Sequence, residues 1–133
     1  MDALAAAAGP AASAVPDWAL VNSRVLVVFG PVLILTGIAG FLIPPRFALM
    51  SGAPAYNLFH IAFGVLGTVL VLAGSRRGIA VFNLGFGAAD VYQAIAGVAG
   101  WFPARQFRYK RADHVVHVVL GLALAGVGWM GLR

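Results

Sequence analysis

The stretch YNLFHIAFGVLGTVLVLA fills positions 56–73 and decides the class of fold. It is long and apolar enough to cross a bilayer, because a helix needs about 20 apolar residues to span a hydrocarbon core about 30 Å thick. Its apolar residues are continuous and do not alternate with polar ones, which favours a helix over a barrel strand. It nevertheless carries Asn57 and His60 near its start. Ionisable side chains inside a membrane are costly, so His60 is a candidate functional residue.

Three other stretches are also long, continuous and apolar. The sequence therefore predicts membrane spans at about 21–43, 56–73, 79–102 and 114–132. Residues that end helices or stay in water separate these spans: the PPR of 44–46, the GSRRG of 74–78 and the segment 103–111. We therefore expect an all-α polytopic membrane protein in which four transmembrane helices form a bundle. Residues 21–133 make up this domain. Residues 1–20 are expected to be an N-terminal tail, without the basic start of a cleaved secretory signal.

Composition supports the same class. Of the 133 residues, 62% are hydrophobic and only 10% are charged, far from the average of soluble domains. Cysteine is absent, which excludes disulfides, thiolate metal sites and cysteine nucleophiles. The net charge of +5 comes from basic residues at the ends of spans, where they meet lipid headgroups. We therefore expect the lipid bilayer as a partner, and no nucleic acid.

The sequence also predicts an internal repeat of two tandem helix hairpins. The GIAGF of 37–41 returns as the GVAGW of 97–101, and each is followed by proline, arginine and phenylalanine. The second and fourth spans match through two histidine frames, Asn57-x-x-His60-x-x-x-Gly64 and Asp113-His114-x-x-His117-x-x-x-Gly121. Two units of two helices have the same orientation in the membrane. His60 and His117 should therefore lie at similar depth near one membrane face.

Each of these histidines is followed one helical turn deeper by a glycine, which permits two interpretations. The glycine allows a neighbouring helix to approach closely, with hydrogen bonds between helices adding stability. The structural polar cluster would then comprise Asn57, His60, Asp90, Gln93, Asp113 and His117. Alternatively, the glycines leave room for a flat cofactor, with His60 and His117 as axial ligands of a haem b or as contacts of a quinone.

Proton transfer and metal binding are further possibilities for the histidines. His114 is expected at the water interface, and no tight ligand spacing indicates zinc, so we predict no metal site. Asp90 falls near the bilayer middle, where an ionised carboxylate costs roughly 2.5 to 3.5 kcal/mol. We expect it to be protonated or hydrogen-bonded within the bundle. Either a structural hydrogen bond or a proton-relay role would explain its presence.

These motifs together resemble a family of small four-helix bacterial membrane proteins that is catalogued only as a domain of unknown function. The resemblance rests on G-x-x-G-F near the end of the first span, on N-x-x-H-x-x-x-G-x-x-G from Asn57, and on D-x-x-x-H-x-x-x-G from Asp113. It covers about residues 25–129. It implies the four-helix fold and a location in the bacterial inner membrane, and it implies no enzyme activity.

We therefore expect a non-enzymatic integral membrane protein without a cofactor. It would be an accessory or structural subunit, packed in a larger membrane complex or against copies of itself. The alternative is a small haem- or quinone-binding membrane anchor that uses His60 and His117. The first and third turns carry Arg46, Arg105, Arg108, Lys110 and Arg111, against Arg24, Arg76, Arg77 and Arg133 on the opposite face. The denser cluster favours cytoplasmic turns and periplasmic termini.

Overall fold

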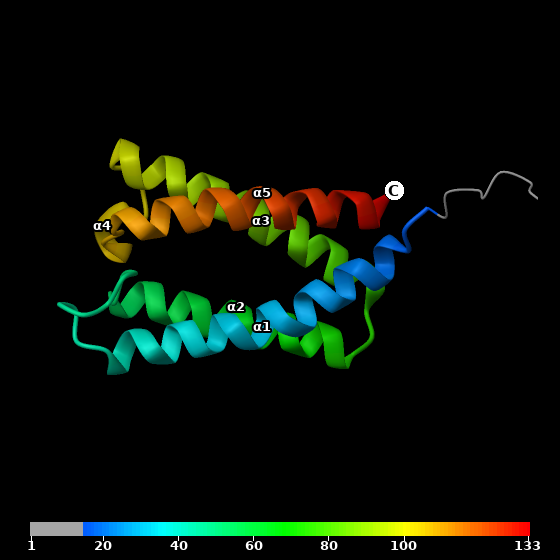
Figure 1. Ribbon diagram of the computed structural model, residues 1–133, viewed down its shortest axis with the longest axis horizontal. Helices are drawn as coiled ribbons and strands as arrows, with labels where there is room; N and C mark the ends of the chain where they lie inside the picture. Colours follow the sequence, from blue (N-terminus) through cyan, green and yellow to red (C-terminus); the bar gives the residue numbers. More distant parts are fainter. Residues whose placement is uncertain (1–14) are drawn as a thin grey trace, which may run out of the picture.

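The computed structural model describes residues 15–133, which fold into four long helices and one short one (Figure 1). The long helices are α1 (Trp18–Leu42), α2 (Pro54–Leu72), α3 (Arg76–Ala99) and α5 (Arg111–Leu132). Each is long and apolar enough to span a membrane. The predicted all-α, four-span bundle is therefore confirmed. Residues 1–14 of the predicted tail lie outside the described residues, and Trp18 to Leu20 already belong to α1.

Capping groups explain why the long helices begin two or three residues before the predicted spans. The Asp17 carboxylate accepts a hydrogen bond from the backbone N–H of Leu20 (3.1 Å) at the start of α1. The Ser75 hydroxyl accepts one from the N–H of Gly78 (3.2 Å) at the start of α3. Such side chains satisfy N–H groups that have no partner within the helix. Polar caps therefore set these boundaries, outside the apolar runs on which the predicted spans were based.

The connection between α3 and α5 is more ordered than the turn that the sequence predicts. Helix α3 ends at Ala99, three residues before the predicted end, because Gly100 adopts the left-handed conformation (φ 72°) that terminates helices. A short helix, α4 (Ala104–Phe107), follows within the predicted turn. It brings the buried Phe107 side chain toward α2.

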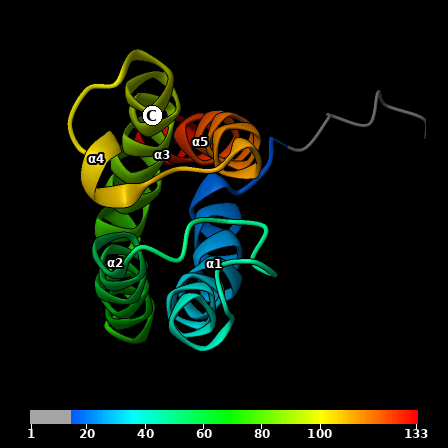
Figure 2. The ribbon, with the colours of Figure 1, turned by 90° about the vertical axis from the view of Figure 1, so that its left-hand side faces the viewer.

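The long helices form two hairpins. Helix α1 runs beside α2, and α3 runs beside α5 (Figure 1). Seen from the end of the bundle, α1 lies on the same side as α5, and α2 lies on the same side as α3 (Figure 2). The start of α1 and the C-terminus lie at one end, called here the terminus end. The turn end, at the opposite end, holds the segments 43–53 and 100–110.

Glycines allow the two helices of each hairpin to approach closely. A Cβ atom at Gly64 would lie 2.7 Å from the carbonyl oxygen of Gly30, and one at Gly121 would lie 2.8 Å from that of Gly87. No side chain fits at such distances. The glycines that follow the two histidines therefore serve helix packing within their own hairpins.

Apolar side chains fill the space between the hairpins. Phe29 of α1 meets Phe86 of α3 edge to face, with ring centroids 5.5 Å apart. The buried members of this core are Leu26, Leu33, Ile79, Phe82, Phe86 and Leu124. Large apolar side chains also cover the outside of every long helix, among them Val28, Leu35, Leu66, Val81 and Leu122. This surface suits lipid, because hydrocarbon solvates such side chains without cost.

Candidate functional site

A buried carboxylate, Asp113, joins the two hairpins at the turn end. It accepts hydrogen bonds from the Tyr56 hydroxyl of α2 (2.8 Å) and from the backbone N–H of Ser51 (3.0 Å), in the segment that follows α1. The N–H of Lys110, at the start of α5, also donates to it (2.6 Å). Asp113 is fully buried, so these charge-assisted bonds replace the water that it has lost. The carboxylate therefore connects the second hairpin to two separate parts of the first.

The position of Asp113 follows from the start of α5. It lies in the first turn of that helix, where a negative charge is favoured by the helix dipole and N–H groups need acceptors. The Ser51 hydroxyl donates a short hydrogen bond to the carbonyl of Phe107, which adds a second link between the hairpins. The Lys110 ammonium donates to the carbonyl of Pro45 (2.8 Å) and closes the same end from outside.

Tyr56 is the central side chain of this site. Its ring centroid lies 4.1 Å from that of His60 and 6.0 Å from that of His117. Phe107 and Tyr109 meet it edge to face, at 5.7 and 6.2 Å. The buried Tyr56 phenol therefore contacts both histidines. His60 and His117 lie in the same region, beside this ring.

A hydrogen bond assigns the proton position of the His60 imidazole. His60 Nδ1 lies 2.8 Å from the carbonyl oxygen of Tyr56, and a carbonyl only accepts, so Nδ1 carries a proton and Nε2 keeps a lone pair. Tyr56 donates its only hydroxyl proton to Asp113. The Nε2 atom of His117 lies farther away, 3.5 Å from the same hydroxyl oxygen.

The other residues of the predicted polar cluster have separate environments. Asn57 donates to the carbonyl of Gly52 (3.2 Å), in the turn after α1. Gln93 accepts a hydrogen bond from the Tyr109 hydroxyl (3.1 Å). Asp90 is buried on α3, and its Oδ1 atom has no hydrogen-bond partner within residues 15–133. The six residues thus belong to neighbouring contacts and do not form one continuous network.

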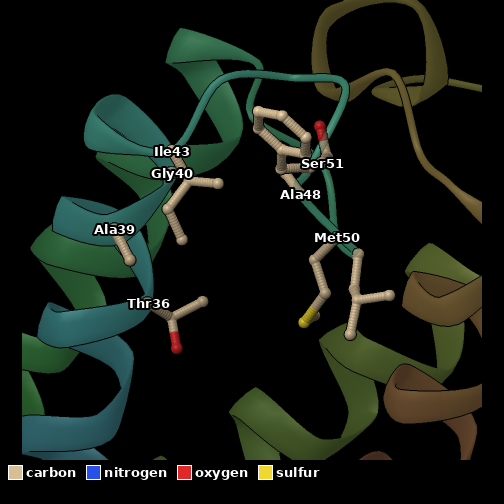
Figure 3. A pocket seen from close by; sticks show the side chains of 9 residues that line it. Thr36, Ala39, Gly40, Ile43, Ala48, Met50 and Ser51 are labelled. Carbon is tan, nitrogen blue, oxygen red and sulfur yellow. The ribbon is translucent and has the colours of Figure 1, made fainter.

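His60, Asp90 and His117 line a cavity of about 170 Å³ between the hairpins. Helices α1, α3 and α5 supply most of its wall, and Met50 closes it toward the turn end. A neighbouring pocket of about 300 Å³ lies beyond Thr36 and Met50, between the end of α1 and the segment 47–51 (Figure 3). That second pocket has no titratable side chain in its lining. Of these two, the cavity beside the histidines is therefore the one whose side chains can exchange protons or bind a polar ligand.

The arrangement does not fit a bis-histidine haem. A volume of 170 Å³ is below the range of about 300–1,000 Å³ that is usual for pockets of drug-sized ligands. Gly64 and Gly121 give no room for a macrocycle, because they pack on α1 and α3. Nor do residues 15–133 contain a group of three or more His, Asp or Glu side chains placed to hold a metal ion.

Sequence reasoning missed a second polar contact, at the terminus end. Asn22 of α1 donates to the carbonyl of Val127 on α5 (2.7 Å), and its Oδ1 accepts from Asn83 of α3 (2.9 Å). Both asparagines are fully buried. A search for buried polar residues within every span, beyond the histidine frames, would have found them. The same search would not have found Ser51 and Tyr109, which lie in connecting segments.

Tyr109, in the connection between α4 and α5, has a perturbed phenol. Burial, and next the negative charge of Asp113, raise the pKa of this phenol above its ordinary value. The neutral hydroxyl is the form that donates to Gln93. Tyr109 therefore acts as a stable hydrogen-bond donor at the turn end.

The fold and composition define a four-span integral membrane protein. Comparisons of the chain with protein-family models, with curated protein sequences and with solved structures found no match.

Proposed function

We propose that the protein is a non-enzymatic integral membrane subunit that has an accessory or structural role in a larger membrane assembly or in a homo-oligomer. The main support is the position of Asp113, whose hydrogen bonds from Ser51 and Tyr56 hold the two hairpins together. A carboxylate with these partners stabilises the bundle and has no free oxygen directed at a substrate.

The distribution of mass and surface also favours this role. The longest segments between the long helices are 43–53 and 100–110, and the second of these contains α4, a single helical turn. Nearly all of the surface available for a protein contact is therefore the apolar outside of α1, α2, α3 and α5. Partners would meet this subunit within the membrane.

Native mass spectrometry of the protein, extracted from its own membrane in lipid nanodiscs at its natural expression level, tests this role. We expect a particle heavier than the 13.8 kDa chain, containing further copies or other membrane subunits in fixed stoichiometry. A population that consists only of single 13.8 kDa chains would contradict the proposal.

We also propose membership of the small bacterial four-helix family and a location in the bacterial inner membrane. The motifs around Asn57 and Asp113 support this assignment. The proposed orientation has the turn end in the cytoplasm and both termini in the periplasm, because basic residues are denser at the turn end. Reporters fused to the C-terminus should be active only if they function in the periplasm; cytoplasmic activity would reverse the orientation.

The two hairpins are proposed to be an internal repeat with a spacing of 57 residues. Gly30 and Gly64 are in contact, and so are the residues 57 positions later, Gly87 and Gly121. His60 and His117 have the same spacing. In this register Gly97 corresponds to Gly40, three positions beyond the Gly37 that the sequence motif suggests. A Cβ at Gly40 would meet the Asn57 side chain, as one at Gly97 would meet His114.

A further inference from the structure

The cavity between the hairpins presents hydrogen-bond acceptors that the protein itself does not use. His60 Nε2 carries a lone pair, because the Nδ1 atom of the same ring donates to the Tyr56 carbonyl. His117 Nδ1 and Asp90 Oδ1 are buried without a partner among the described residues. The three side chains are each at least 96% buried, with exposed fractions of 4% (His60), 2% (Asp90) and 2% (His117). Unpaired buried acceptors are costly, so this group favours a molecule that donates hydrogen bonds.

The cavity is accessible from the side of the bundle, between α1 and α5. Val32 and Leu120 line it, and both are partly exposed on the lipid-facing surface. They also line a groove of about 510 Å³ that continues between α1 and α5 toward Arg24 at the terminus end. The surface of the groove is almost entirely apolar. A molecule that reaches the acceptors by this route must therefore be soluble in the membrane.

The wall of the cavity favours a flat ring. Phe29 and Phe86 both line it. The cavity is too small for a large polar head group, whereas the adjoining groove accommodates a long apolar chain. A ligand with two or more hydrogen-bond donors on a small ring and a long apolar tail matches the acceptors, the aromatic wall and the groove together.

We propose that the cavity and the groove bind a membrane-soluble hydroquinone. Its ring lies against Phe29 and Phe86, its hydroxyl groups donate to His60 Nε2 and to the Asp90 carboxyl group, and its tail follows the groove between α1 and α5. The oxidised quinone has two carbonyl acceptors in place of these donors. It leaves the lone pair of His60 and the Asp90 oxygen unpaired, so the site discriminates against it.

Anaerobic calorimetric titration of the purified full-length protein in detergent tests this site, with decylhydroquinone and decylbenzoquinone as probes and protein-free micelles as the blank. We expect saturable binding of one decylhydroquinone per chain, with an affinity at least about tenfold higher than that for decylbenzoquinone. Equal affinity for both probes, or no saturable binding of decylhydroquinone, would overturn the proposal.

Matched variants locate the site. Val116→Phe places a larger side chain in the cavity, whereas Val115→Phe adds the same ring at the neighbouring exposed position of α5. We expect Val116→Phe to weaken decylhydroquinone binding at least about tenfold and Val115→Phe to leave it within about twofold. Equal binding by these two variants would contradict the location.

A third variant, Asp90→Asn, keeps the shape of the side chain and exchanges one acceptor for an amide donor. It should reduce the preference for decylhydroquinone over decylbenzoquinone at least about fivefold. If Val116→Phe does not yield a folded, monodisperse protein, Asp90→Asn still tests whether the cavity binds decylhydroquinone. An unchanged preference would exclude Asp90 from the site and refute the proposed set of acceptors.

Discussion

The contacts within each hairpin and the contacts between the hairpins use different chemistry. Within a hairpin, glycines bring the backbones together, as at Gly30 with Gly64 and at Gly87 with Gly121. Between the hairpins, aromatic rings and a few buried hydrogen bonds provide the contact, with Asp113 and Tyr56 at the turn end. Lipid tails are as apolar as leucine, so neither interface is driven by the hydrophobic effect alone. Close packing stabilises the first interface, and polar partners stabilise and orient the second.

The largest effect is expected from filling a glycine contact within a hairpin. In Gly87→Ala the new Cβ would lie 2.4 Å from the backbone nitrogen of Ala125 and 2.6 Å from the carbonyl oxygen of Gly121. Helix α3 must then move away from α5, at a cost of about 1–3 kcal/mol. Reversible unfolding in mixed micelles, followed by circular dichroism, measures this loss.

Gly85→Ala is the matched control in the same helix. Within residues 15–133, no atom outside the adjoining part of α3 lies within 4 Å of the added Cβ, so the substitution should be neutral or should stabilise α3 by up to about 1 kcal/mol. Equal losses in the two variants would mean that close approach at Gly87 does not hold the second hairpin together.

A smaller effect is expected from the polar contact at the terminus end. Asn22→Ala removes the side-chain amide that donates to the Val127 carbonyl. It also removes the side-chain oxygen that accepts a hydrogen bond from Asn83. Interhelical hydrogen bonds in membranes contribute about 0.6 kcal/mol on average and up to about 1.7 kcal/mol, so a loss of about 1 kcal/mol is expected in the same unfolding assay. Ser23→Ala is the control, because the Ser23 hydroxyl donates to the carbonyl of Ala19 within the same helix (2.9 Å). A similar loss in both variants would show that the Asn22 contact between the hairpins adds nothing to the free energy of unfolding.

The next effect depends on pH and concerns Tyr109. The folded state raises the pKa of this phenol, so it favours the neutral form. The resulting stability is fully present below the unfolded pKa of about 10 and is lost as the pH rises above that value toward the folded pKa. The melting temperature should therefore fall less between pH 9 and pH 11 in Tyr109→Phe than in the wild type. An unchanged slope in Tyr109→Phe would contradict the expectation.

No effect is expected in the visible spectrum. The cavity beside His60 and His117 is too small for a haem, so the purified protein should be colourless. His60→Ala and His117→Ala should have the same spectrum as the wild type. A Soret band in stoichiometric amount, lost in both variants, would instead mean that the hairpins separate to admit a haem.

Much of the fold could be predicted from the sequence, because continuous apolar runs and proline or glycine breaks indicate membrane helices directly. The boundaries were less accurate, since caps such as Asp17 and Ser75 precede the apolar residues. Helix α4 was missed because a four-residue helix has no periodic pattern of its own.

The candidate site could be predicted only in part. His60, Asp90 and His117 were identified because ionisable residues are conspicuous in apolar spans, and the structure places all three around one cavity. The partners of Asp113 were not identified, because Ser51 lies in a turn and its backbone N–H is the donor. Backbone donors are present at almost every position, so sequence does not reveal which one a buried carboxylate will use.

A double-mutant cycle on Tyr56→Phe and Asp113→Asn tests most directly whether hydrogen bonds hold the two hairpins together. The cycle measures the free energy of unfolding of the wild type, both single variants and the double variant in mixed micelles. Tyr92→Phe with Asp113→Asn is the control cycle, because the Tyr92 hydroxyl donates to the Phe102 carbonyl. The 2.8 Å bond between the Tyr56 hydroxyl and Asp113 predicts a coupling of at least about 1 kcal/mol, against a value near zero for the control. A coupling of zero between Tyr56 and Asp113 would contradict the account.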